Sequence, residues 1–189
     1  MADTKKNNID KPVWVYLMVS RNKDNKNRVP NFHERRCTFL SSKGDMSDYI
    51  NDRFSDFVRH GCHGEFSRLY RSVNSRDVEC VKKRFLYEYI MKDIDITKLE
   101  SKAAAIAAGS ACAAEKKWLF DFDDDDILKL DEFVSGVKEN TPVTIHKTPH
   151  GFAVVAEHGF DTRKILKKWE NIVTLKRDGM LFLKSGVKD

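Results

Sequence analysis

The hydrophobic pattern changes near Lys116 and divides the chain into two parts. In the first part, aromatic and β-branched runs predict strands, and apolar residues spaced three and four apart predict helices. These are a strand at 13–21, helices at 46–61 and 75–93, a strand at 65–73 and an alanine-rich helix at 98–117. We therefore expect a disordered tail at residues 1–12, followed by an N-terminal α/β portion at residues 13–115.

The second part, residues 116–189, alternates between the two patterns more regularly. It predicts a strand at 118–123, a helix at 127–140, a hairpin of strands at 141–149 and 152–158, a helix at 161–169 and a final strand at 171–185, which either continues or turns at Asp178 and Gly179. The order β-α-β-β-α-β is the split βαβ, or RRM-like, plan. The predicted fold class is therefore α/β (α+β), with an RRM-like βαββαβ core at residues 116–189 and the N-terminal portion packed on it.

The composition is typical of a folded protein that works inside the cell. Hydrophobic residues make up 41% of the chain and charged residues 33%, which leaves enough apolar side chains for a core. The sequence contains no apolar run of membrane-spanning length, and it begins with a polar segment instead of a signal peptide. We expect a cytoplasmic protein without a membrane partner, whose four cysteines are reduced thiols.

Several histidines and cysteines lie close enough in the sequence to raise the question of zinc. They are His33, Cys37, His60, Cys62 and His63. Imidazole and thiolate groups are zinc ligands, but this spacing matches none of the standard zinc patterns. A polar loop after a helix is the simpler interpretation, and zinc is not the cofactor that we expect.

The charge is uneven along the chain, although the net charge is only +5. Residues 1–50 contain ten Lys and Arg against six Asp and Glu, whereas residues 101–150 contain six against nine. Basic surfaces beside an acidic centre favour a partner that carries phosphate and a metal ion. A general excess of lysine on the surface would give a similar distribution.

The acidic centre is a run in which five of six residues, from Asp121 to Asp126, are aspartate. Alternate side chains of a strand share a face, so Asp121 and Asp123 point one way while Phe120 and Phe122 point the other. Two such carboxylates suit Mg²⁺ or Mn²⁺, which prefer oxygen ligands. The alternative is that the run ends a strand and caps the next helix. That alternative explains residues 124–126 but not Asp121, which lies inside the strand.

A third carboxylate, Asp178, follows on or near the last strand. If that strand lies beside the first strand of the RRM-like core, Asp178 joins Asp121 and Asp123 as a metal ligand and catalytic residue. Two metal ions held in this way can clamp the attacking and leaving oxygens of a phosphoryl transfer.

Two further segments suit phosphate binding. The hairpin segment HKTPHGF offers the side chains of His146, Lys147, Thr148 and His150 around a Pro-x-Gly turn. An ordinary hairpin turn has the same composition. Three arginines, Arg68, Arg71 and Arg76, flank a strand end and a helix start, where a nucleotide or backbone phosphate can bind. A solvated basic face explains the arginines equally well.

These motifs together resemble the archaeo-eukaryotic primase superfamily, which includes the primase-polymerases. Asp121 and Asp123 match its first motif, Asp-x-Asp after an apolar stretch, and Asp178 is similar to the acidic residue of its third motif. The resemblance covers about the last 75 residues. It implies divalent-metal-dependent binding of nucleotides, DNA or RNA, and nucleotidyl transfer with Mg²⁺ or Mn²⁺.

The chain departs from this family at two positions. Ala153 stands where the family has a histidine that contacts the incoming nucleotide, and Arg177 stands where an apolar residue is expected. His150 lies three residues too early, and His146 lies on the preceding strand. The resemblance therefore points to a minimal or degenerate member, of the kind that viruses and other small mobile genomes carry.

Other functions remain open from the sequence. An RRM-like sheet can bind single-stranded RNA through exposed aromatic residues, for which Phe120, Phe122 and Phe152 are the candidates. An inhibitor or adaptor that binds a protein partner can keep an enzyme's fold. A metal-dependent nuclease would use the same carboxylates as a nucleotidyltransferase.

Overall fold

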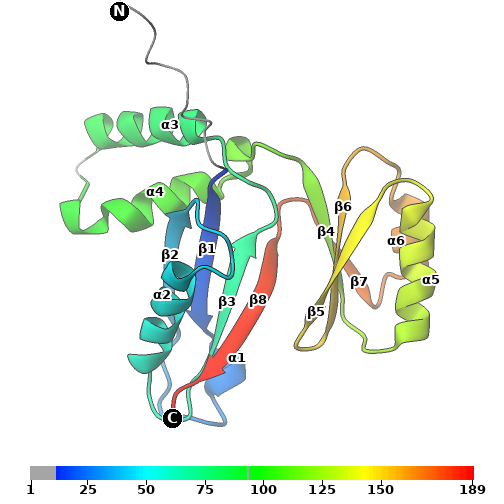
Figure 1. Ribbon diagram of the computed structural model, residues 1–189, viewed down its shortest axis with the longest axis horizontal. Coiled ribbons are helices and arrows are strands. Elements are labelled where there is room, and N and C mark those ends of the chain that lie inside the picture. The colour runs from blue at the N-terminus through cyan, green and yellow to red at the C-terminus, as the bar shows by residue number, and fades with distance from the viewer. Residues whose placement is uncertain (1–11, 93) are drawn as a thin grey trace, which may run out of the picture.

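The computed structural model describes residues 12–92 and 94–189, and most of the predicted tail lies outside these residues. The described residues form two antiparallel four-stranded sheets that stand side by side (Figure 1). The strands are β1 (Trp14–Ser20), β2 (Arg35–Ser41), β3 (Phe66–Ser72), β4 (Lys117–Phe122), β5 (Val143–Thr148), β6 (Gly151–Glu157), β7 (Val173–Lys176) and β8 (Met180–Val187). The helices are α1 (Asn22–Asn25), α2 (Asp48–Arg59), α3 (Val78–Met91), α4 (Leu99–Ala108), α5 (Ile127–Lys138) and α6 (Arg163–Lys168), with short 3₁₀ turns at Ile96–Lys98 and Ser110–Cys112.

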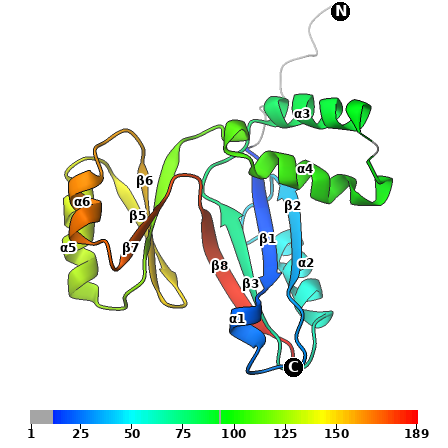
Figure 2. The ribbon, with the colours of Figure 1, turned by 180° about the vertical axis from the view of Figure 1, so that it is seen from behind.

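The N-terminal sheet has the strand order β2-β1-β3-β8. Helix α2 covers one face of this sheet, because Ile50 and Phe54 lie one helical turn apart and pack against Tyr16 and Phe39. The hairpin of α3 and α4 covers one end of the sheet (Figure 2). The small side chain of Ala107 is fully buried there, as the alanine-rich sequence predicts.

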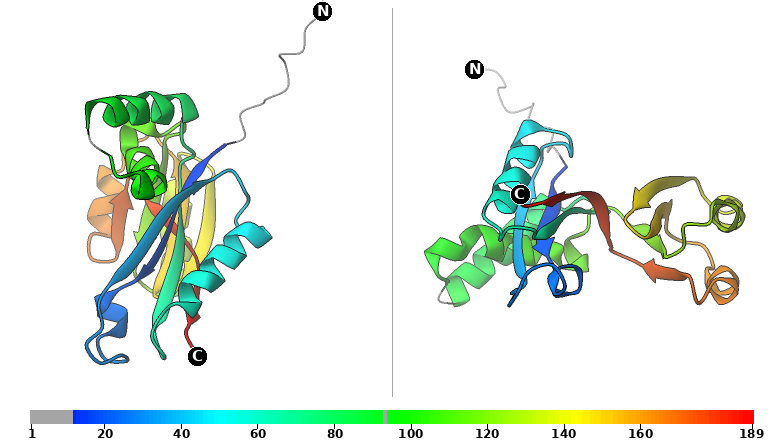
Figure 3. Two further views of the ribbon diagram at one scale, coloured as in Figure 1. Left: turned by 90° about the vertical axis from the view of Figure 1, so that its left-hand side faces the viewer. Right: turned by 90° about the horizontal axis from the view of Figure 1, so that it is seen from below.

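The C-terminal sheet has the strand order β5-β6-β4-β7. Both α5 and α6 lie on its outer face, away from the N-terminal sheet (Figure 3). Their apolar residues bury Phe120 and Phe122 completely, and the ring centroids of Phe120 and Phe133 are 5.6 Å apart. The α+β class and the β-α-β-β-α-β order are confirmed. The three phenylalanines proposed for stacking RNA bases lie in this core and do not form an open face.

The last strand corrects the predicted division of the chain. The chain turns at Asp178 and Gly179, and β8 then pairs with β3 of the N-terminal sheet. The C-terminal sheet is therefore complete at Lys176, and residues 180–187 belong structurally to the N-terminal part. This crossing joins the two sheets covalently, and an apolar cluster of Val73, Leu119, Ala153 and Leu181 packs between them.

Two further elements differ from the predictions. Strand β2 was not predicted, because it begins with two arginines and forms the edge of its sheet. The helix predicted at 98–117 ends at Ala108, since Gly109 and the following 3₁₀ turn lead the chain to β4. Within the described residues, no helix is long and apolar enough to cross a membrane.

Candidate functional site

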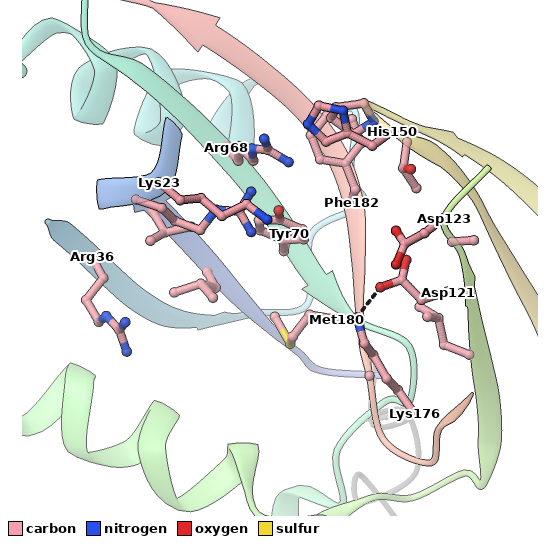
Figure 4. Close-up of a pocket in the computed structure, with 18 of the residues that line it drawn as sticks. Lys23, Arg36, Arg68, Tyr70, Asp121, Asp123, His150, Lys176, Met180 and Phe182 are labelled. Carbon is pink, nitrogen blue, oxygen red and sulfur yellow. Dashed lines mark hydrogen bonds and ion pairs between the residues drawn. The ribbon is translucent and has the colours of Figure 1, made fainter. Parts of the chain in front are cut away.

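A cleft of about 760 Å³ opens between the two sheets. Its lining comes from both sides (Figure 4). The C-terminal sheet contributes Asp121 and Lys176, with Asp123 directly after β4, whereas the N-terminal part contributes mainly cations and aromatic rings, and its carboxylate in the lining, Glu34, pairs with Arg36. The charged and aromatic residues that line it are Arg21, Lys23, Glu34, Arg36, Arg68, Tyr70, Asp121, Asp123, His150, Lys176, Asp178 and Phe182. This division of charge makes the cleft the candidate site.

Asp121 and Asp123 both line the cleft, and Phe120 and Phe122 lie on the opposite side of β4. The alternation predicted from the sequence therefore places the two carboxylates on one wall. Asp123 is exposed, whereas the Asp121 side chain is only 26% exposed. The Oδ2 atom of Asp121 accepts a hydrogen bond from Nζ of Lys176, which stands on the neighbouring strand β7.

The remaining aspartates of the run stabilise the start of α5. The side chain of Asp126 accepts a hydrogen bond from the backbone N–H of Leu128 at 2.9 Å. The Asp124 side chain lies 2.7 Å from Nζ of Lys129, and this contact holds the pKa of the Asp124 carboxyl below its usual range. The acidic run thus combines both interpretations: its first two aspartates face the cleft, and its last three lie around the helix start.

The β5–β6 hairpin brings its turn against the end of β4. Gly151 has a φ of 134°, and a Cβ atom there would lie 2.0 Å from the carbonyl oxygen of Phe122. Only glycine permits this approach, which places Thr148 and His150 on the cleft wall next to the aspartates. The turn therefore has a positional role that its composition alone did not reveal.

The other two hairpin residues lie elsewhere. Lys147 is 60% exposed and pairs with Asp125, outside the cleft lining. His146 lines a second, smaller cavity of about 320 Å³ together with Arg71. Burial and the nearby guanidinium of Arg71 lower the pKa of His146. The structure thus separates these side chains from the two cleft aspartates.

Asp178 and Arg76, predicted as metal ligand and phosphate ligand, are paired with each other. Nη1 of Arg76 lies 2.7 Å from Oδ2 of Asp178, and the two side chains are 2% and 13% exposed. Asn74 donates a further hydrogen bond to Oδ1 of Asp178 at 3.1 Å. Asp178 contributes to the cleft lining, but both of its carboxylate oxygens accept hydrogen bonds from Arg76. These bonds hold the β7–β8 turn against the segment that connects β3 to α3. This arrangement favours a structural role over metal binding.

The other two predicted arginines differ from each other. Arg71 pairs with Asp45 away from the main cleft. Arg68 lines the cleft, is almost completely buried, and lies 2.8 Å from Asp24, while its Nε atom has no hydrogen-bond partner among the described residues. Arg68 is therefore a fixed cation in the wall opposite the aspartates.

The rest of that opposite wall was not predicted from the sequence. Lys23 and Arg36 come from α1 and β2, which were not predicted. Tyr70 and Phe182 lie between the two charged walls, with ring centroids 5.8 Å apart at an angle of 73° (Figure 4). Phe182 reaches the cleft only because β8 pairs with β3, so no local pattern could have indicated it.

The residues beside Asp121 limit the number of metal ligands. In the sheet register, Asp121 lies opposite Ala153 on β6 and Thr174 on β7, and neither side chain adds a carboxylate or an imidazole. The described residues contain no cluster of three or more His, Cys, Asp or Glu side chains that could hold a metal ion, at the cleft or around His60 and Cys62. Two carboxylates are still enough for Mg²⁺ or Mn²⁺, because these ions keep several waters and take further oxygens from phosphate.

No family model matches the chain. A tRNA dimethylallyltransferase of Ruthia magnifica subsp. Calyptogena magnifica is 23% identical over 131 residues, which cover 67% of this chain and 40% of that enzyme. The chain thus spans less than half the length of this relative, and the similarity leaves the family open.

Proposed function

We propose that the cleft binds a nucleotide or a nucleic-acid backbone together with a divalent cation, and that its chemistry is nucleotidyl transfer of the primase-polymerase kind. The observation that carries this proposal is that two carboxylates face a wall of cations across one cleft. Asp121 and Asp123 would hold the metal ion. Lys23, Arg36 and Arg68 would take the phosphate oxygens.

The chemistry of the two walls supports this assignment. A phosphate group alone would be repelled by Asp121 and Asp123. The wall opposite offers a metal ion no free carboxylate among the described residues, because Glu34 in that wall is paired with Arg36, and Asp24 is paired with Arg68. A metal–phosphate complex satisfies both walls at once. When bound, the ion would polarise the phosphoryl oxygens and neutralise charge on them.

The proposal predicts that removing the cations weakens triphosphate binding. The double variant Lys23→Ala/Arg36→Ala should bind a non-hydrolysable adenosine triphosphate analogue with Mn²⁺ about tenfold more weakly in calorimetry, since two exposed charges near the phosphates are lost. The matched control is Lys164→Ala/Lys167→Ala, which removes two exposed charges from α6 on the outer side of the molecule. Equal affinities of the two double variants would contradict this use of the cation wall.

Two assays would separate the reactions that this site can perform. Extension of a labelled primer tests bond formation, and degradation of the same labelled strand tests bond cleavage. A metal-dependent nuclease would give only the second result, because the carboxylates serve both reactions equally well.

The second candidate is a protein that binds single-stranded nucleic acid without catalysing a reaction. Tyr70 and Phe182 favour it, because aromatic rings beside cations are the usual platform for unpaired bases. Two further features favour binding without catalysis: position 153 is alanine instead of the histidine of the primase family, and Asp121 is paired with Lys176. The similarity to a protein named as a tRNA-modifying enzyme supports RNA as one such strand.

This candidate predicts binding that needs no metal. In EDTA, Tyr70→Leu and Phe182→Leu should each weaken binding of a fluorescent oligouridine by about tenfold, in line with about 1–3 kcal/mol per stacked base. Tyr87→Leu, which alters an exposed ring on α3, should bind as the wild type does in fluorescence anisotropy. Unchanged affinity in both cleft variants would exclude this platform.

A further inference from the structure

The cleft contains one cation that lies on the wall of the carboxylates. Lys176 is the last residue of β7, and the sheet register pairs it with Leu119, two residues before Asp121. Lys176 and Asp121 therefore leave the sheet on the same face, as diagonal neighbours on adjacent strands. Their contact is the only ion pair of Asp121 among the described residues, and a dashed line marks it in Figure 4.

In the described part of the chain, the surroundings of Asp121 provide no other charged partner for its carboxylate. The strand neighbours Ala153 and Thr174 carry no charge. Asp178, a further carboxylate of the cleft lining on the β7–β8 turn, is engaged by Arg76. Lys176 thus neutralises the less exposed of the two cleft aspartates, and a divalent cation at Asp121 must either displace the ammonium group or bind beside it against repulsion.

We propose that Lys176 is a built-in counter-ion that opposes metal binding at Asp121 until a phosphate arrives with the metal. This inference rests on the proposed metal–phosphate site. The Lys176 side chain is 45% exposed, and its flexible stem lets the ammonium group move from the carboxylate to a phosphate oxygen. Metal and triphosphate then bind cooperatively, because each favours the arrangement that the other needs.

The test measures binding of Mn²⁺ alone, and of Mn²⁺ with a non-hydrolysable adenosine triphosphate analogue, from the electron paramagnetic resonance signal of free Mn²⁺. Lys176→Met removes the charge and keeps most of the side-chain length. It should bind Mn²⁺ alone about tenfold more tightly than the wild type, and the increase should be much smaller with the triphosphate. Lys176→Gln is the second uncharged variant, so the result does not depend on how one substitution packs.

Two control variants isolate the effect. Lys176→Arg keeps the positive charge and should bind Mn²⁺ as weakly as the wild type. Lys129→Met removes a lysine that is 46% exposed and pairs with Asp124 of the same acidic run, outside the cleft lining. It should leave the affinity for Mn²⁺ unchanged, which separates the local ion pair from a general change of net charge.

The outcomes distinguish this inference from the proposed function. If both uncharged variants bind Mn²⁺ alone with the affinity of the wild type, the counter-ion role is overturned. The proposed metal–phosphate site still stands in that case, provided that the wild type and all variants bind Mn²⁺ together with the triphosphate. If only the uncharged variants bind Mn²⁺ under either condition, Lys176 blocks the site and the proposed function of the wild type fails. If no protein binds Mn²⁺, both proposals fail.

Discussion

Replacing Asp178 with alanine should lower the free energy of unfolding by about 3–5 kcal/mol, the range for removing one partner of a buried ion pair. The variant leaves the guanidinium group of Arg76, whose side chain is 2% exposed, without its carboxylate and with an Nε atom that already has no partner among the described residues. It also removes a contact that holds the β7–β8 turn against the strand connection before α3. Urea unfolding followed by circular dichroism measures the loss.

The matched control for this prediction is Glu132→Ala. Glu132 pairs with Lys168 across the surface of α5 and α6, and both side chains are more than half exposed. Surface pairs of this kind contribute little, so the change should stay below about 1 kcal/mol. An Asp178→Ala protein that unfolds like the wild type but no longer binds Mn²⁺ would contradict the structural role and return Asp178 to the metal site.

The sequence predicted those features that depend on local pattern. The alternation of β4 placed Asp121 and Asp123 on one face. The helical spacing of the apolar residues at 127–137 predicted a buried side of α5, which is confirmed for Leu130, Phe133, Val134 and Val137 but wrong for Ile127 and Leu128, which are exposed in the first turn. These predictions succeeded because each depends on the geometry of a single element. The order of helices and strands in the C-terminal sheet was also predicted correctly, since short loops leave few alternative connections between neighbouring elements.

The features that were not predicted depend on pairing between segments that are distant in the sequence. Arg76 and Asp178 are 102 residues apart, and nothing near either residue indicates its partner. Strand β8 joins the N-terminal sheet through pairing with β3, which brings Phe182 into the cleft. The cation at Asp121 was missed for the same reason, because Lys176 and Asp121 meet only across two neighbouring strands.

The second large effect concerns the cleft aspartates themselves. Asp121→Asn/Asp123→Asn should weaken binding of Mn²⁺ and triphosphate by about 100-fold or more, which corresponds to about 2.8 kcal/mol. Asparagine keeps the shape of the side chain but removes the charge that a hard cation requires. The fold should persist, because Asp121 is only partly buried, Asp123 is exposed, and the core residues Phe120 and Phe122 are unchanged.

The control for this variant is Asp125→Asn/Asp131→Asn, which removes two exposed charges at the start of α5 and on it, outside the cleft lining. It should bind metal and triphosphate as the wild type does. A similar loss in both double variants would mean that overall charge, and not the position of the carboxylates, governs binding.

The decisive measurement for a metal site at Asp121 and Asp123 is calorimetric titration of Mn²⁺ with the non-hydrolysable triphosphate into the wild type and Asp121→Asn/Asp123→Asn. We expect the wild type to bind the triphosphate more tightly with Mn²⁺ than in EDTA, and the double variant to lose this difference. Triphosphate binding that is the same with and without metal in both proteins would contradict a metal site at these aspartates, and the cleft would then be a surface for nucleic acid or protein alone.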